Sequence, residues 1–242
     1  LAGDPLTQLR GEARRQRPAV PDGLLAPSLP RAPRVPPDPF SRLVAPGTLL
    51  LAWSALLASG GSPRDGVDAV GLKAFGEQLP DELATLRAEL LDDRYRPLPP
   101  RWIELPKEDG GSRRIGLVAT RDRVVQRAFL SLAEPWFEPY FSDRSFAFRA
   151  GRGAHQALLT LLGSPRAQRG WLVHLDVASC FDTVPHDLLL ARFAERLPCP
   201  RMLGLLASWL RYGLGNAGLP DSLGVGLVQG WAIEIGRASC RE

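Results

Sequence analysis

Apolar residues recur at helical spacing in two stretches that follow a Pro-rich start. Thr48 can cap the first helix, which ends before Gly60. Its apolar positions are Leu49, Leu50, Trp53, Leu56 and Leu57. The second stretch covers about residues 71–90, with one interruption at Pro80 because proline lacks the N–H that a helix interior needs. The pattern predicts two amphipathic helices.

Residues 101–107 alternate apolar and polar side chains, which is the period of a strand that buries one face. A turn with two adjacent glycines follows in residues 108–112, and residues 113–118 return to an apolar pattern. This order predicts a β-hairpin. Helices are expected after it, over residues 121–141 with breaks at two prolines, and over residues 154–162. The two prolines are Pro135 and Pro139.

Residues 171–177 form a short apolar run with one carboxylate, Asp176, near its C-terminal end, and a helix is expected from Pro185 onward. A strand that ends in a carboxylate and leads into a helix is an active-site arrangement in many α/β layers. A buried unpaired charge is costly, so a cation should lie beside Asp176, and Mg²⁺ is the natural candidate because it takes oxygen ligands. A carboxylate that pairs with an arginine or caps the following turn is the commoner alternative for such a residue, and it stays open.

Basic residues occur at two places where phosphates can bind. Lys107 and the pair Arg113 and Arg114 lie on the two arms of the expected hairpin, which can close over a triphosphate. A surface hairpin with solvated charges is the commoner alternative. Arg149 and Arg152 precede an expected helix N-terminus, where they can hold a nucleic-acid phosphate or pair with nearby carboxylates. The residues alone leave these alternatives open.

The composition is that of a globular protein with an extended start. The chain has 242 residues, of which 45% are hydrophobic and 23% are charged, and this is enough to bury one or two cores. Residues 1–46 are rich in Pro and Arg without apolar periodicity, so we expect a disordered leader whose arginines are solvated or touch RNA. A formal net charge of +4 and a pI near 9.3 are compatible with a polyanionic partner without identifying one.

Cysteine spacing and hydropathy argue against several classes of protein. The three cysteines lack the close paired spacing of a zinc site and the density of a disulfide framework. The longest apolar stretch, residues 48–59, is too short to cross a bilayer, and no secretory leader pattern is found. The three histidines follow no metal-ligand spacing and are interpreted as structural. We therefore expect a cytoplasmic protein with no membrane partner.

Six segments resemble, in order, the motifs of the reverse transcriptases of bacterial group II introns and their relatives, which include CRISPR-associated reverse transcriptases. They are residues 62–68, 105–114, 121–126, 145–155, 175–188 and 224–230. The fourth is similar to the box Ser-Tyr-Gly-Phe-Arg-Pro-Gly-Arg-Ser-x-His, and the last to the motif that ends in Pro-Gln-Gly. Single motifs of this kind are weak evidence, whereas six in the family's order over most of a chain are strong.

The resemblance implies an α+β fold of the right-hand polymerase type with fingers and a partial palm. We expect the leader over residues 1–46, an N-terminal extension with the fingers over 47–165, and part of the palm over 166–234. Residues 235–242 match a translated sequencing adapter in register, so we expect an artefact there, with a divergent natural C-terminus as the alternative. The start at Leu1 rather than at Met suggests a fragment.

The resemblance also assigns roles to single residues. It implies that Asp176 binds both catalytic Mg²⁺ ions and that the backbone carbonyl of Val177 binds one of them. It places Phe181 under the sugar of the incoming nucleotide, where the ring would exclude a 2′-OH and favour dNTPs. The other nucleotide-binding positions that it implies are Lys107, either Arg113 or Arg114, Gln229 and Gly230, and the nucleic-acid contacts are Arg149 and Arg152.

Departures from the family pattern bear on activity. Ala150 and Val228 stand where the family usually has proline, so we expect these two loops to be looser than usual. More seriously, the Tyr-Ala-Asp-Asp box, which supplies the remaining carboxylates, and the thumb are absent from these 242 residues. Two-metal phosphoryl transfer needs several oxygen ligands, so we expect this chain to be inactive by itself.

The function that the resemblance implies is RNA-directed DNA synthesis by an intact parent. Such an enzyme is a nucleotidyltransferase that uses an RNA template, a DNA or RNA primer, dNTPs and Mg²⁺. A non-catalytic RNA-binding module on a polymerase fold is the alternative from a different class. A third possibility keeps the chemistry and changes the task, as in antiphage or retron-type enzymes.

Overall fold

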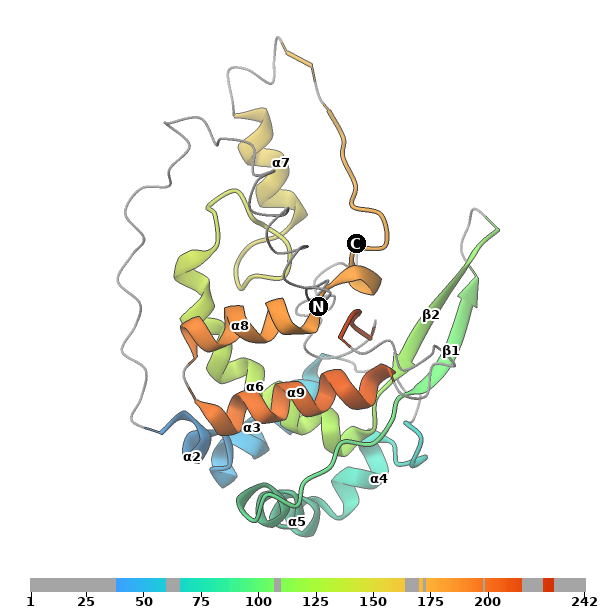
Figure 1. Ribbon diagram of the computed structural model, residues 1–242, viewed down its shortest axis with the longest axis vertical. Coiled ribbons are helices and arrows are strands. Elements are labelled where there is room, and N and C mark those ends of the chain that lie inside the picture. The colour runs from blue at the N-terminus through green and yellow to red at the C-terminus, as the bar shows by residue number, and fades with distance from the viewer. Residues whose placement is uncertain are drawn as a thin grey trace, which may run out of the picture. The chain divides into compact units, whose positions relative to one another are not determined.

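The computed structural model describes most of the chain between residues 38 and 228 (Figure 1). The described ranges are 38–59, 66–106, 110–163, 170–171, 173–197, 199–214 and 224–228. They belong to one of the two units of the chain, Ala32–Glu242. The expected leader up to residue 37 and the expected artefact lie outside the described residues. Three residues of the expected nucleotide site lie outside them as well, namely Lys107, Gln229 and Gly230.

Two helices open the described region, and the first lies within the expected disordered leader. Phe40 and Leu43 are buried there, so the expectation of disorder is wrong for residues 38–46. Helix α2 (Pro39–Leu43) is capped by Asp38, whose carboxylate accepts two backbone N–H hydrogen bonds from the first turn, each at 3.1 Å. Helix α3 (Pro46–Ala58) begins two residues before Thr48, so the prediction that Thr48 caps it is wrong. The helix instead begins with a proline, which fits the first turn because no N–H is needed there.

The second amphipathic stretch forms two helices, α4 (Leu72–Glu77) and α5 (Leu79–Leu91). The interruption falls at Gln78 and not at Pro80, which lies in the first turn of α5. Proline is tolerated at that position for the same reason as in α3.

The expected hairpin is confirmed. Strands β1 (Arg101–Pro106) and β2 (Ser112–Leu117) pair antiparallel. Gly116 of β2 lies so close to Val228 that a Cβ atom at this position would be 2.3 Å from the Val228 Cγ1 atom. Glycine is therefore required where the segment that ends at Val228 reaches the hairpin.

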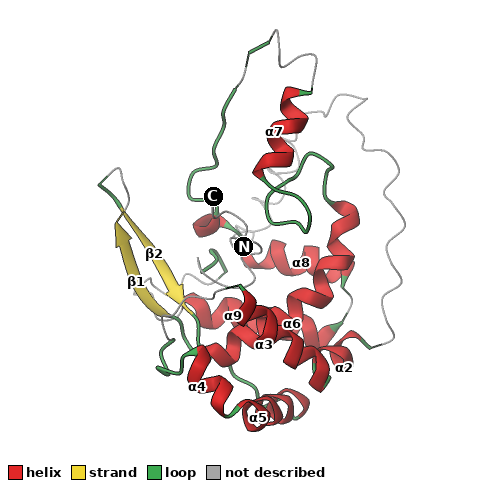
Figure 2. Ribbon diagram, turned by 180° about the vertical axis from the view of Figure 1, so that it is seen from behind, coloured by secondary structure: helices red, strands yellow, loops and turns green. Residues whose placement is uncertain are grey.

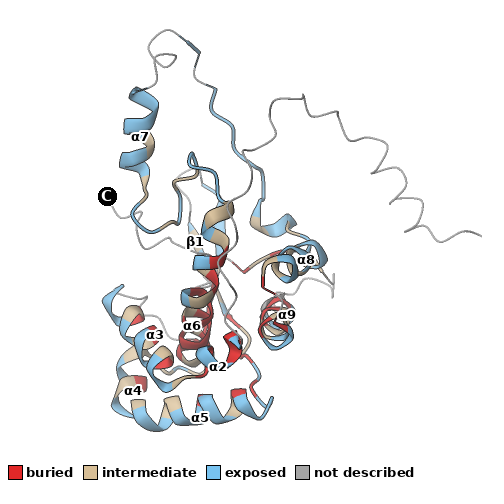
Figure 3. Cartoon of the chain, turned by 90° about the vertical axis from the view of Figure 1, so that its left-hand side faces the viewer, coloured by how far each residue is buried: buried red, intermediate tan, exposed pale blue. Residues whose placement is uncertain are grey.

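Helix α6 (Thr120–Phe137) contacts helices α2, α3 and α4 and carries many buried residues, as Figure 3 shows by its red colour. Helix α9 (Pro200–Leu214) also contributes to the core. The rings of Phe129 on α6 and Trp209 on α9 meet edge to face, with their centroids 5.3 Å apart.

The remaining helices follow the expected order with one exception. Helix α6 continues through Pro135, so the break expected there is wrong, and Pro139 lies in the short helix η1 (Glu138–Tyr140) that follows. Helix α7 (Ala154–Leu162) has the bounds that the sequence predicts. Helix α8 (His186–Arg196) begins directly after its expected proline.

A buried carboxylate joins α6 to two other parts of the chain. Asp122 is 0% exposed, and its carboxylate accepts hydrogen bonds from the Tyr95 hydroxyl at 2.6 Å and from the Leu98 backbone N–H at 2.8 Å. The indole N–H of Trp209 donates to the Tyr95 hydroxyl at 3.2 Å. Burial raises the pKa of Asp122 to about 6, against the opposing effect of these hydrogen bonds.

The strand expected over residues 171–177 does not form in the described part of that run. Among the described residues the sheet contains only β1 and β2, so the backbone of this run has no neighbouring strand with which to bond. The side chains of Val173, Leu175 and Val177 are 72%, 85% and 69% exposed. Figures 1 and 2 show the stretch running apart from the helices. The fold is α+β as expected, with its described strands in the hairpin.

We expect Asp122→Asn to reduce the pH dependence of stability. The folded-state pKa of Asp122, about 6, lies above its ordinary value of 3.8, so its contribution to the free energy of unfolding falls as pH rises through this window and is level above it. The whole shift corresponds to ~3 kcal/mol, of which ~1 kcal/mol is lost between about pH 5 and pH 7. Urea unfolding at these two values should show a smaller difference for the variant than for the wild-type chain.

The matched control is Asp81→Asn, an exposed carboxylate in the first turn of α5. It should leave the pH dependence of unfolding as in the wild-type chain. Equal pH dependence in Asp122→Asn and the wild-type chain would contradict the role given to burial.

Candidate catalytic and nucleotide-binding site

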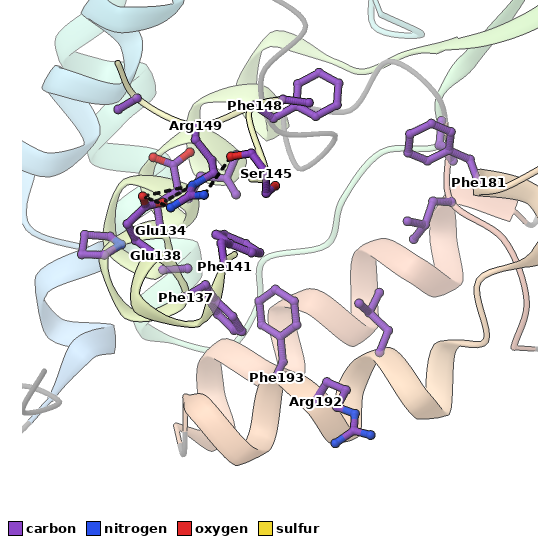
Figure 4. A pocket seen from close by; sticks show the side chains of 18 residues that line it. Glu134, Phe137, Glu138, Phe141, Ser145, Phe148, Arg149, Phe181, Arg192 and Phe193 are labelled. Carbon is purple, nitrogen blue, oxygen red and sulfur yellow. Dashed lines mark hydrogen bonds and ion pairs between the residues drawn. The ribbon is translucent and has the colours of Figure 1, made fainter. Parts of the chain in front are cut away.

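A tight turn separates Asp176 from Phe181. Ser179 has a φ of 48°, in the left-handed region, and the short helix η2 (Phe181–Thr183) continues the turn. Asp176 precedes the turn on the exposed stretch. Phe181, at the start of η2, has a half-buried side chain that lines a pocket (Figure 4).

The expected metal ligands do not form a complete metal site in the described part of the chain. Asp176 and Val177 are both exposed. Among the described residues, no three His, Cys, Asp or Glu side chains gather where they could hold a metal ion. Within the described residues Asp176 is therefore a single carboxylate, and its role as a metal ligand stays a prediction.

Residues 224–228 lie against the Phe181 turn through backbone hydrogen bonds. The Leu227 N–H donates to the Phe181 carbonyl at 2.7 Å, and the Gly226 N–H donates to the Val184 carbonyl at 2.8 Å. Two segments that are far apart in the sequence, and that each resemble a polymerase motif, are thus brought together. We call this contact the backbone clip.

His186 adds a side chain to the backbone clip. Its backbone N–H donates to the Gly224 carbonyl at 2.6 Å, and its ring Nε2 atom lies 2.6 Å from the Gly226 carbonyl oxygen, so it donates there. The structural role expected for His186 is what the geometry shows. Both glycines have a φ of 101°, which other residues rarely adopt, and a Cβ atom on Gly226 would lie 3.3 Å from the Asp182 carbonyl oxygen.

Residues 224–228, which we call the clipped segment, lead from the Phe181 turn to the hairpin. Val228, at its end, is 1% exposed and packs against Gly116. Val228, which stands where the family usually has proline, is thus packed in the core. Gln229 and Gly230, the expected nucleotide-pocket residues, follow it directly in the sequence.

The structure separates the two candidate arginines of the hairpin. Arg113 and Arg114 are neighbours on β2, so their side chains point to opposite faces. The guanidinium of Arg114 lies 5.0 Å from the centre of the Trp102 ring, in a cation–π contact. Arg113 is exposed on the other face.

The hydrogen bonds of the Arg149 side chain go to neighbouring residues of its own region of the chain. Its side chain is 5% exposed, and its Nε and Nη2 atoms donate to the Glu138 carboxylate at 2.6 to 3.1 Å (Figure 4). Its Nη1 atom donates to the carbonyls of Ser142 and Ser145 at 2.6 and 2.8 Å. These hydrogen bonds from Arg149 hold the pKa of Glu138 below its ordinary value.

Arg152 makes a similar contact, with Nη2 3.1 Å from a carboxylate oxygen of Asp143 and Nη1 2.6 Å from the Asp143 carbonyl. Pairing with nearby carboxylates, one of the two alternatives that the sequence leaves open, therefore describes Arg149 and Arg152 in this structure. Their contact with a nucleic-acid phosphate stays a prediction.

An apolar pocket of about 770 Å³ lies between α6, the loop that follows η1, α8 and the Phe181 turn (Figure 4). Its aromatic walls are Phe137, Phe141, Phe148, Phe181 and Phe193. Glu134 also lines it, and burial raises the pKa of this carboxyl. No local sequence pattern predicts the pocket, because its walls come from segments far apart in the chain, and the signal that these segments share is their phenylalanines.

Comparisons with known proteins bear on the family of this chain. Residues 105–233 match the family described as reverse transcriptase (RNA-dependent DNA polymerase). Protein YkfC of Escherichia coli (strain K12) is 36% identical over 197 residues, which are 79% of this chain and 51% of YkfC. The group II intron-encoded protein LtrA of Lactococcus lactis subsp. cremoris is 27% identical over 175 residues, 72% of this chain and 28% of LtrA.

A solved structure titled "Partial Cas6-RT-Cas1--Cas2 complex" superposes with a TM-score of 0.49 at 17% identity, over 80% of this chain and 32% of that one. Within the described residues, no helix is both long and apolar enough to cross a membrane. The chain spans about half of YkfC and less than a third of LtrA. Because the family match covers more than half of its residues, the chain belongs to the reverse transcriptase family, the RNA-dependent DNA polymerases.

Proposed function

We propose that this chain supplies the fingers and part of the palm of a reverse transcriptase that copies an RNA template into DNA. The primer is DNA or RNA, the substrates are dNTPs, and the enzyme works in the cytoplasm. The observation that carries the proposal is the family match over residues 105–233, which includes strand β2 of the hairpin and the backbone clip. The chain spans only part of its relatives, so catalysis is assigned to a longer protein that contains it.

The number of metal ligands that catalysis needs supports the assignment of catalysis to a longer protein. Two-metal transfer needs several oxygen ligands to hold both ions in line with the attacking and leaving oxygens. The described residues gather no such set, and Asp176 with the Val177 carbonyl does not fit two ions alone. Mg²⁺ binding at Asp176 in the longer protein is part of the proposal, and no catalytic step is assigned to the 242-residue chain.

The nucleotide site is proposed where the hairpin and the Phe181 turn meet the clipped segment. The backbone clip fixes the Phe181 carbonyl, and Val228 packs on β2, so Gln229 and Gly230 continue from a held position. Lys107 and Arg113 are assigned to the triphosphate, because Arg114 lies over Trp102. Arg149 and Arg152 keep a proposed role in RNA binding, through the loop that they order.

The direct test is primer extension on an RNA template by the full-length gene product, with Mg²⁺ and dNTPs. Extension supports the polymerase, and RNA binding without extension would favour the non-catalytic RNA-binding module.

In the full-length protein, Asp176→Asn should lower kcat by roughly a thousandfold while RNA affinity stays within about twofold. The reason is that a metal-ligating carboxylate acts mainly in the transition state, and its loss does not change phosphate contacts elsewhere. Single-turnover extension and RNA filter binding measure the two quantities. Asp187→Asn, which changes an exposed carboxylate on α8, is the matched control and should extend normally. Near-normal extension by Asp176→Asn would sink the catalytic assignment.

Phe181→Ala should keep DNA synthesis and raise rNTP incorporation relative to dNTP incorporation by about 10 to 200-fold, the range of a steric effect of roughly 1–3 kcal/mol. The change opens room for a 2′-OH and removes no ionisable group. The control is Phe148→Ala, which removes another ring from the same pocket. Equal loss of both activities in Phe181→Ala, together with a lower Tm, would instead show that the ring only supports the core.

Arg113→Ala should raise the KM for dNTPs by about 10 to 100-fold, the range for the loss of a hydrogen bond to a charged group. Arg114→Ala removes the contact with Trp102 and should change KM by less than about threefold while lowering the Tm slightly. Steady-state kinetics on one RNA template compares the two variants. The opposite ranking would assign the triphosphate contact to Arg114.

A further inference from the structure

The peptide bond between Gly226 and Leu227 is held from both sides by residues 181–186. The Gly226 carbonyl oxygen lies 2.6 Å from the Nε2 atom of the His186 ring, and the Leu227 N–H donates to the Phe181 carbonyl at 2.7 Å. A trans peptide is planar, so its C=O and N–H groups point in opposite directions. A rotation of this peptide breaks both hydrogen bonds, and the two contacts therefore depend on each other.

The backbone has little restraint of its own at this peptide. Gly224 and Gly226 both have a φ of 101°. Glycine has the widest range of backbone conformations, so fixing it costs more conformational entropy than fixing any other residue. The His186 ring adds a side-chain hydrogen bond to the backbone hydrogen bonds here. The position of His186 is itself fixed, because it begins α8 and its backbone N–H donates to the Gly224 carbonyl at 2.6 Å.

The held peptide is connected to two parts of the candidate nucleotide site. On one side it bonds to the backbone of Phe181, whose ring lines the apolar pocket together with the Leu227 side chain. On the other side the chain continues through the buried Val228 to Gln229 and Gly230. A rotation of the peptide would therefore disturb both the Phe181 backbone and the start of the segment that leads to Gln229.

We propose that His186 is a positioning residue for nucleotide selection, which acts through the Gly226–Leu227 peptide on Phe181 and on the segment that leads to Gln229. The proposal rests on the reverse transcriptase function proposed above. The ring needs no contact with the nucleotide, because the backbone carries its effect. The neutral ring with a proton on Nε2 and the charged ring both donate to a carbonyl, so the role is geometric and not electrostatic.

Three substitutions separate the hydrogen bond of His186 from the shape of its ring. His186→Phe keeps a ring and removes the donor. His186→Gln removes the ring and places an amide N–H donor at a similar reach. Asp187→Asn changes an exposed carboxylate in the same turn of α8 and is the matched control for the helix itself.

Single-nucleotide extension on an RNA template by the full-length protein measures the effect. His186→Phe should raise the KM for dNTPs by about 3 to 10-fold, the range for the loss of one hydrogen bond between neutral groups, with kcat within about threefold. Its discrimination of dNTPs from rNTPs should fall by a similar factor, because the Phe181 ring is less well fixed. His186→Gln and Asp187→Asn should stay within about twofold of the wild-type protein in both quantities.

A double-mutant cycle tests the route through Phe181. Phe181→Ala leaves no ring to position, so the further change His186→Phe should alter the discrimination of dNTPs from rNTPs by less than about twofold in that background. An equal effect of His186→Phe with and without the Phe181 ring would show that His186 acts by another route, and would overturn the proposal.

Hydrogen exchange measured by mass spectrometry on the same full-length protein tests the contact without catalysis. His186→Phe should speed amide exchange in residues 224–228 by about 3 to 10-fold, and His186→Gln should restore the protection. Amides of α6, which carries many buried residues, should exchange as in the wild-type protein.

The outcomes distinguish this role from a merely structural one. Unchanged KM and unchanged discrimination in His186→Phe would refute the positioning role. An equal loss of dNTP and rNTP incorporation, with a lower Tm that His186→Gln does not recover, would also refute it, because that pattern marks a side chain that only supports the fold. A wild-type protein that does not extend a primer would instead overturn the reverse transcriptase function, and hydrogen exchange would still decide whether the ring holds the peptide.

Discussion

The buried carboxylate of Asp122 is the constraint on which the core depends. A carboxylate at 0% exposure is costly unless donors surround it, and its donors come from outside α6. The Tyr95 hydroxyl and the Leu98 N–H lie in the segment that leads to β1, so satisfying Asp122 also positions the start of the hairpin. Trp209 donates to Tyr95 and packs edge-on against a ring of α6, so the polar network and the aromatic core share a residue. Helix α6, helix α9 and the hairpin are therefore held as one unit.

The candidate nucleotide site is attached to this unit mainly through backbone contacts. The hairpin accepts Val228 because Gly116 has no side chain, and the clipped segment then bonds to the carbonyls of Phe181 and Val184. Two glycines with a φ of 101° allow the close approach. The His186 ring, which bonds to the Gly226 carbonyl, and the buried Val228 side chain add to these backbone contacts.

The sequence predicts what depends on near neighbours and fails where partners are distant. Helix α7 has the predicted bounds because helical hydrogen bonds join residues four apart, and the hairpin is confirmed for a similar reason. The run at 171–177 has a strand pattern, but a strand needs a ladder partner that no local pattern supplies. The sequence identifies Arg149 as a cation, but only the fold shows that its guanidinium pairs with the carboxylate of Glu138, eleven residues away. The pocket that Phe181 lines could not be predicted from the sequence for the same reason, because four separate segments of the chain line it.

Dependence on distant partners also explains the state of the run that carries Asp176. Residues 173–177 have the alternating pattern of a strand, but none of them belongs to a strand and all of them are exposed. A strand is completed by hydrogen bonds to a neighbouring strand, and a metal ion is held by several oxygen ligands. Neither set of partners lies among the described residues. The backbone of this run and the carboxylate on it therefore depend on the same thing, which is partners from outside the described residues.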